Sequence, residues 1–291
     1  MTEPLVSIVV PSYNHAKFIS KAIDSVLSQT YQNFEIIIAD NCSDDGTDRI
    51  LASYKDHRIR TFKLKNEGII AKSRNLAIKE ARGEWVAFLD SDDWWFDNKL
   101  ESCISNANNS TQVIYHDMKV FDGDNDIITN KILKSRKLRN PVLIDLLVNG
   151  NCLINSSVMV RREMLTKVGG IDERRGLVTG EDYHCWMKLA RESNNFLYLP
   201  KELGYYTVHQ RGMSRRDVVA QTRLAVNDFS SNLTVKQLNH ANAFLSYFSL
   251  VNLQENKSKS IENAIFCFKN GKPIIKFKAF VVLSRLLLKK T

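Results

Sequence analysis

With 291 residues, of which 44% are hydrophobic and 25% charged, the chain can form one large α/β domain, alone or with a smaller appendage. Five widely spaced cysteines without a Cys-x-x-Cys pair argue against a disulfide framework or a zinc site. No apolar stretch is long enough for a spanning helix, and the first residues do not resemble a signal peptide, so we expect a cytoplasmic protein.

The first hundred residues alternate apolar runs with amphipathic segments, which predicts a mostly parallel sheet with crossover helices. The predicted strands cover 5–10, 34–39, 59–64 and 85–89, and the predicted helices cover 16–28, a short segment ending near 54, 70–81 and 97–108. A strand over 113–121 is followed by the polar segment 122–140, which we expect to be a loop. Later strands are predicted over 153–160, 196–198 and 205–208, and helices over 162–168 and 183–191.

The charge divides the chain into two regions. The net charge is +9, and residues 216–291 carry 12 basic against 4 acidic residues. This stretch is predicted to be helical, so we expect an α/β domain over 1–215 and a basic helical region over 216–291.

Polar side chains follow the first three predicted strands. Tyr13, after the first strand, can stack on a nucleobase or simply pack as a ring. Asp40, after the second, can accept a hydrogen bond from a base imide. A glycine-containing turn after the third strand opens a helix bearing Lys72 and Arg74, which suits a phosphate but is also compatible with ordinary solvated cations.

The fourth strand ends in Asp90-Ser91-Asp92-Asp93. Two carboxylates separated by one residue can bind a hard divalent cation, which in turn neutralises a substrate diphosphate. The alternative is an acidic turn that leads into a helix. Asp93 is expected to do no more than start that helix.

In combination, these motifs resemble the inverting glycosyltransferases of family 2, which have the Rossmann-like GT-A nucleotide-sugar fold. The resemblance covers about residues 4 to 215 and is carried by 6–14, Asp40, Asn66 with Gly68, 71–75 and 90–93. It implies that Tyr13 and Asp40 hold the base, that Arg74 reaches the ribose or diphosphate, and that Asp90 serves the ribose. It also implies that Asp92 contacts Mg²⁺ or Mn²⁺. The expected donor-binding set is completed by Pro11, Lys72 and Ser91.

An inverting transfer needs a general base for the acceptor hydroxyl. The resemblance assigns this role to Asp182, with Glu181 in reserve, although acids at a helix start are common in any case. It further implies that His209 is a metal or phosphate contact, with Arg211 and Ser214 as weaker candidates; a surface histidine is the alternative. Trp94 and Trp95 can stack on a sugar or be buried in the core.

The resemblance implies transfer of a sugar, from a UDP-sugar by preference, to a glycan or lipid-linked glycan in bacterial surface polysaccharide synthesis. The alternative is a catalytically silent nucleotide-sugar binding or assembly protein. A dehydrogenase is disfavoured because no Gly-x-Gly-x-x-Gly follows the first strand. The basic, apolar segment 273–290 fits either the inner face of the cell membrane or a homo-oligomer contact, and no nucleic-acid partner is expected.

Overall fold

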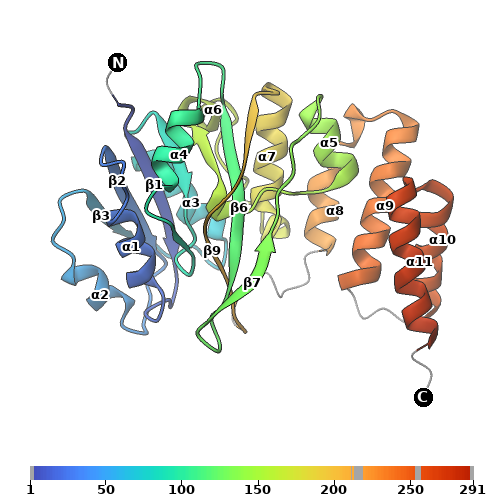
Figure 1. Cartoon of the computed structure of the whole chain (residues 1–291), viewed down its shortest axis with the longest axis horizontal. Coiled ribbons are helices and arrows are strands. Elements are labelled where there is room, and N and C mark those ends of the chain that lie inside the picture. The colour runs from blue at the N-terminus through green and yellow to red at the C-terminus, as the bar shows by residue number, and fades with distance from the viewer. Residues whose placement is uncertain (1–2, 211, 213–218, 253–256, 289–291) are drawn as a thin grey trace.

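The computed structural model describes residues 3–210, 212, 219–252 and 257–288. Within these residues, a nine-stranded sheet has the order β3-β2-β1-β4-β8-β6-β9-β5, and β7 pairs with β6 (Figure 1). The strands are β1 (Val6–Ser12), β2 (Phe34–Asp40), β3 (Ile59–Lys63), β4 (Trp85–Phe88), β5 (Trp94–Trp95), β6 (Val113–Asp122), β7 (Ile127–Leu133), β8 (Met159–Arg161) and β9 (Phe196–Val208).

The helices of the α/β part are α1 (Ile19–Leu27), α2 (Thr47–Ser53), α3 (Ile70–Glu80), α4 (Lys99–Asn106), α5 (Val142–Asn149), α6 (Arg162–Lys167) and α7 (Glu181–Glu192). The later helices are α8 (Val219–Asn227), α9 (Val235–Asn252), α10 (Lys257–Asn270) and α11 (Pro273–Leu288). The 3₁₀ turns among the described residues are η1 (Asn155–Ser157), η2 (Arg175–Leu177) and η4 (Ser230–Asn232).

The predicted parallel sheet forms over β3-β2-β1-β4, where every residue of β1 and β2 is buried. Alternate residues of β1 pack into two hydrophobic clusters, one on each face of the sheet, because helices cover both faces. The register pairs Ser12 with Asp40, so the ends of β1 and β2 lie side by side. Beyond β4 the sheet is mixed, since β8 runs antiparallel to both β4 and β6.

Three expectations for the middle of the chain were wrong. The expected loop over 122–140 contains β7, which forms a hairpin with β6; its residues are almost all exposed, so no buried face marked it as a strand. The two short strands over 196–198 and 205–208 are one strand, β9, which runs parallel to β6 with two register irregularities. The strand predicted over 153–160 is mostly coil and η1, and helix α5 had not been predicted.

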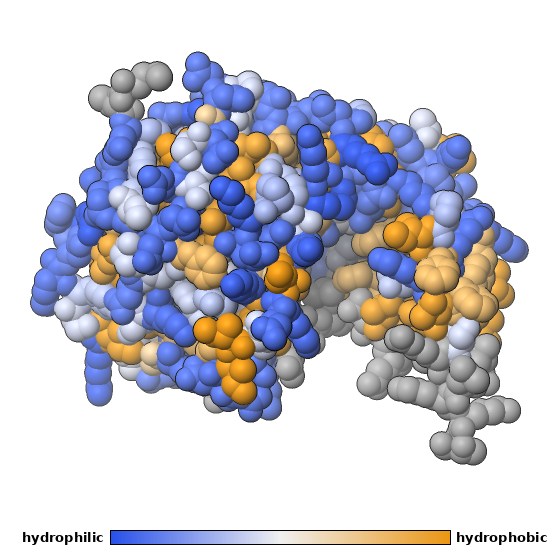
Figure 2. Space-filling view, viewed as in Figure 1, coloured by the Kyte–Doolittle hydropathy of each residue, from blue (hydrophilic) through white to orange (hydrophobic). Residues whose placement is uncertain are grey.

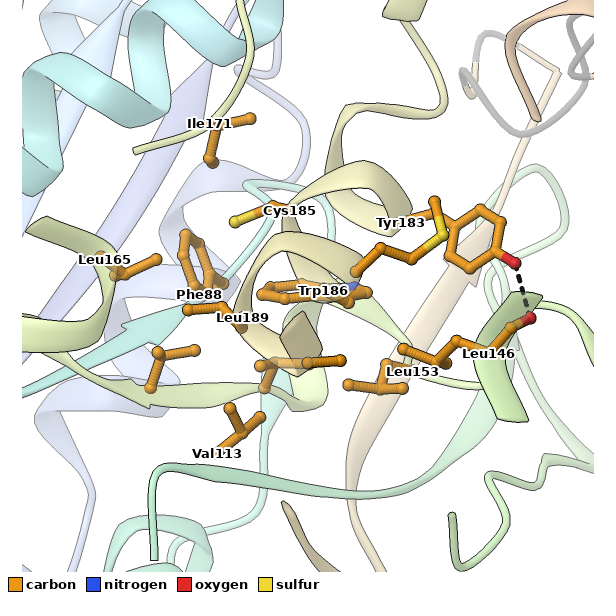
Figure 3. Close-up of a cluster of buried hydrophobic side chains, with 14 of the residues drawn as sticks. Phe88, Val113, Leu146, Leu153, Leu165, Ile171, Tyr183, Cys185, Trp186 and Leu189 are labelled. Carbon is orange, nitrogen blue, oxygen red and sulfur yellow. Dashed lines mark hydrogen bonds between the residues drawn. The ribbon is translucent and has the colours of Figure 1, made fainter. Parts of the chain in front are cut away.

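Helix α7 is fixed to the sheet by its apolar face (Figure 3). The ring of Trp186 meets Phe88 of β4 edge-on at 5.5 Å, and both side chains are fully buried, as expected for Trp186 as a core residue. The hydroxyl of Tyr183 donates to the Leu146 carbonyl of α5 at 2.7 Å. These contacts hold the first residues of α7 near the carboxyl end of β4.

The last three helices have a small core of their own around Leu250, Ala264, Cys267 and Ala279. They lie to one side of the sheet, and α9 contacts α5 of the α/β part (Figure 1). Among the described helices, none combines the length and apolarity needed to cross a membrane.

Candidate active site

The carboxyl ends of β1 and β2 carry the expected base-binding residues. Pro11 is buried within β1, whereas Tyr13 is 55% exposed just beyond it, with its ring free to meet a ligand. The Asp40 carboxylate is buried and accepts hydrogen bonds from the backbone N–H of Ser43 at 3.0 Å and from its hydroxyl at 2.5 Å. Asp40 therefore fixes the turn after β2, and its part in base binding stays a prediction.

A buried arginine joins the sheet to α7. Arg74 of α3 is 4% exposed and lies 2.7 Å from Asp90 and 2.5 Å from Glu181. The two carboxylates raise the pKa of Arg74 although burial opposes this, so the guanidinium stays charged. The same Asp90 oxygen accepts a hydrogen bond from Asn155 at 2.9 Å. Arg74 thus positions Asp90 and Glu181, and both of its terminal nitrogens are occupied by protein.

Asp92 converges with two histidines. Its Oδ2 lies 2.9 Å from His209 Nε2, and His15, from the loop after β1, completes a group whose ligand atoms all lie within 4.8 Å of one another. Ser91 Oγ lies 2.6 Å from His15 Nδ1, and the Phe18 ring packs at 5.0 Å against the His209 ring. One carboxylate and two imidazoles can bind a divalent cation such as Mn²⁺, whereas Mg²⁺ prefers oxygen ligands throughout.

Asp93 was expected to start the next helix, and this was wrong, because α4 begins at Lys99. Its carboxylate is buried and accepts a hydrogen bond at 2.8 Å from the backbone N–H of Thr207 on β9. Burial, followed by the charges of Asp92 and Asp90, raises the pKa of Asp93. Asp93 therefore ties β9, and with it His209, to the acidic turn.

Asp182 stands at the first turn of α7, beside the ion pair of Arg74 and Glu181. It accepts a hydrogen bond from the backbone N–H of Tyr183 at 2.6 Å. Burial, reinforced by the neighbouring charge of Glu181 and opposed by Arg74, raises the pKa of Asp182 to about 7. A carboxylate with this pKa is suited to accept a proton near neutrality.

The remaining candidates divide between surface and core. Lys72 forms a partly exposed ion pair with Glu67 at 2.7 Å. Trp94 and Trp95 are both buried, and the Trp95 indole donates to the Ser156 carbonyl at 2.7 Å, so packing in the core is the alternative that the structure supports. Arg211 and Ser214 lie outside the described residues.

Three contributors to the site were missed in the sequence. His15 follows Tyr13 by two residues, and a histidine in the loop of the first strand end was the available signal. Asn155 and Ser156 had no such signal, because they reach Asp90 from η1, in a segment that was predicted as strand.

Comparisons with known proteins identify the family of the chain. A family model described as glycosyl transferase family 2 matches residues 7–169, more than half of the chain. The chain belongs to this family. WfgD of Escherichia coli, named as a UDP-Glc:alpha-D-GlcNAc-diphosphoundecaprenol beta-1,3-glucosyltransferase, is 34% identical over 67% of this chain and 73% of its own length.

Two further matches cover more of the chain. An uncharacterized glycosyltransferase of Nostoc, alr2836, is 27% identical over 86% of this chain and 80% of its own length. The crystal structure of S. aureus TarS 1–349 in complex with UDP-GlcNAc superposes with a TM-score of 0.59 at 21% identity, over 97% of this chain and 80% of that chain. At this identity the likeness speaks for the fold, and the GT-A fold predicted for the family 2 enzyme is confirmed.

Proposed function

We propose that this glycosyltransferase moves a sugar from a UDP-sugar to a hydroxyl of a glycan or lipid-linked glycan, with inversion at the anomeric carbon. The observation that carries the proposal is the approach of Asp92, His209 and His15 to one another, on the same rim as the Arg74 network and Asp182. The name of WfgD, which specifies UDP-Glc as donor and a lipid diphosphate-linked sugar as acceptor, supports the choice of substrates.

Asp92, His209 and His15 would hold a divalent cation, for which the short distances among their ligand atoms are suited. A cation at this place would neutralise the diphosphate and make the nucleoside diphosphate a better leaving group. Asp90 is oriented by Arg74 and Asn155 and would contact the ribose. Tyr13, exposed at the end of β1, would stack on the base.

Asp182 would take the proton from the acceptor hydroxyl as that oxygen attacks the anomeric carbon. Glu181 is the weaker candidate for a base, because it is 4% exposed and its Oε1 is bound to Arg74. An inverting reaction requires one base on the face opposite the leaving group, and a pKa of about 7 suits Asp182 to accept the proton in that role.

Metal and donor binding can be tested without turnover. Titration calorimetry should show that UDP binds more tightly when Mn²⁺ is present. In Asp92→Ala and in His15→Ala, UDP affinity in the presence of Mn²⁺ should be at least about tenfold lower than in the wild type. Glu163→Ala, on the exposed start of α6, is the matched control and should change nothing. If Mn²⁺ does not affect UDP binding, the proposed metal site is wrong.

The catalytically silent alternative makes a different prediction. A binding or assembly protein would retain nucleotide affinity but would neither hydrolyse nor transfer the donor. UDP-glucose hydrolysis by the wild type, lost in Asp92→Ala and retained in Glu163→Ala, would support the enzyme. Hydrolysis that persists at the wild-type rate in Asp92→Ala would contradict the proposed site.

A further inference from the structure

Helix α11 has two apolar faces. Ile275, Ala279, Val282 and Leu283 pack in the small core shared with α9 and α10. On the opposite side, Ile274, Phe277 and Phe280 recur every three residues and are 61%, 67% and 58% exposed. Figure 2 shows the apolar surface that gathers over these C-terminal helices. We call Ile274, Phe277 and Phe280 the α11 stripe.

Cations border the α11 stripe. At 100° per residue, Lys276 and Lys278 lie on the two flanks of the stripe, and both are exposed. Lysines in this position can keep their ammonium groups in water while their alkyl stems extend the apolar surface. Soluble proteins seldom expose two phenylalanines and an isoleucine side by side unless the patch has a function.

A basic cleft adjoins the Lys276 flank. It has a volume of about 170 Å³ between α5, α9 and the start of α11, and its cationic lining residues are Arg139 and Lys272, with His240 beside them. Partial burial and the nearby Lys272, Lys236 and Lys276 lower the pKa of His240, so its imidazole is neutral and the positive charge of the cleft comes from the lysines and Arg139.

The acidic residue of the cleft does not neutralise it. Asp145 is bound by Arg136, accepts a hydrogen bond from Asn149 at 2.6 Å and also attracts Lys272, so its one charge is set against three cations, Arg136, Arg139 and Lys272. Lys272 donates to the neutral Asn149 side chain at 2.9 Å. The cleft therefore keeps an excess of positive charge that suits a phosphate group.

We propose that the α11 stripe and the adjoining basic cleft dock this protein on an anionic phospholipid bilayer. The stripe would enter the interface between headgroups and acyl chains, while Lys276, Lys278 and the cleft would meet lipid phosphates. A bilayer is favoured over a second copy of the chain, because two copies of this strongly basic surface would repel each other. The proposal is independent of the transferase chemistry.

Vesicle co-sedimentation tests the proposal. The full chain should bind phosphatidylcholine vesicles that contain phosphatidylglycerol and should bind phosphatidylcholine alone at least about tenfold more weakly, with the difference reduced at high salt. Phe277→Glu should weaken binding at least about tenfold. Ile128→Glu, at the 60% exposed Ile128 of β7, is the matched control and should bind as the wild type does. Equal binding by Phe277→Glu and wild type would overturn the proposal.

A second measurement covers the case in which Phe277→Glu fails to fold. Phe277→Trp should show blue-shifted emission with vesicles containing phosphatidylglycerol and quenching by brominated acyl chains, whereas Ile128→Trp should show neither change. Sedimentation velocity tests the alternative, in which a second copy of the chain covers the α11 stripe. A concentration-dependent dimer that Phe277→Glu converts to a monomer, together with no lipid quenching of Phe277→Trp, would assign the stripe to self-association instead.

Discussion

Charged side chains are buried at the rim of the sheet that carries the candidate donor site, whereas they are exposed on helix α11. At the rim, Arg74 and Glu181 are buried and hold each other, and Asp93 is buried against β9. In α11, Lys276 and Lys278 are exposed, and so are the aromatic rings between them. Buried charges depend on their partners, whereas exposed ones are screened and act singly. Substitutions at the rim should therefore have large, coupled effects, and those of the exposed α11 residues should leave stability almost unchanged.

The largest effect is expected at Asp182. Asp182→Asn removes the proposed base but keeps its size, so kcat should fall about 10²–10⁴-fold while UDP affinity stays the same. Steady-state kinetics and calorimetry check the two quantities. The control, Glu173→Gln, changes a carboxylate that hydrogen-bonds Asn75 outside the proposed base position. If Asp182→Asn keeps more than about a tenth of the activity, another group is the base.

The same residue predicts a pH dependence. Because a pKa of about 7 leaves Asp182 protonated in acid, kcat/KM should fall about tenfold per unit below pH 7. The raised pKa also means that the folded state disfavours the charged carboxylate of Asp182. The protein should therefore lose stability as pH rises and this group ionises. From about pH 4, where the unfolded group ionises, to about pH 7, the free energy of unfolding should decrease. Asp182→Asn should flatten both profiles.

The next largest effect is expected at Arg74. Arg74→Leu leaves Asp90 and Glu181 near each other without their shared cation, which should lower the free energy of unfolding by about 3–5 kcal/mol. Lys167→Leu removes an exposed pair with Glu192 and should cost at most about 1 kcal/mol. Urea denaturation of both variants measures the contrast. Equal losses would show that the rim is not more coupled than the surface.

Much of the sheet could be predicted because its strands are buried on both faces. β1 and β2 are mostly apolar runs, and their ends fixed the places of Tyr13 and Asp40. β7 carries no buried face, and Pro200 and Lys201 interrupt the apolar pattern of β9, so neither strand was found in full. Local patterns report burial, and strands that are exposed or irregular lack that signal.

The site was predictable where a motif of the family resemblance names the residue, and obscure where a contact has no such motif. Asp92 and His209 were named by motif, and the structure brings them within 2.9 Å. The role of Arg74 was seen only in part, since Glu181, which it binds, is 107 residues away. His15 reaches Ser91 across 76 residues, a contact that depends on the β1–β4 pairing and on no local pattern.

A smaller effect is expected at Gly123, in the turn of the β6–β7 hairpin. A Cβ added there would lie 2.6 Å from Thr207 Cγ2 and 3.4 Å from His209 Cβ, so Gly123→Ala should displace the end of β9. We expect Mn²⁺ affinity to fall about tenfold, as when a residue that orients a metal ligand is changed. Gly169→Ala adds a Cβ that meets no atom within 4 Å and strains only its own backbone, which has a φ of 71°, so it should leave Mn²⁺ affinity unchanged even if it lowers stability. Unchanged affinity in Gly123→Ala would argue against His209 as a ligand.

The smallest effect is expected at Lys72, whose side chain is neither buried like the charges at the rim nor fully exposed like those on α11. Its partner Glu67 is 64% exposed, so Lys72→Ala should change the free energy of unfolding by less than about 1 kcal/mol. If Lys72 binds the donor diphosphate, KM for the donor should rise several-fold at constant kcat, because the contact is the same in substrate and transition state. Glu67→Ala removes the same ion pair and should leave KM unchanged or lower, since it frees the ammonium group. A matching rise of KM in both variants would mean that the ion pair orders the turn before α3, and Lys72 would then belong with the coupled rim rather than with the cations that act singly.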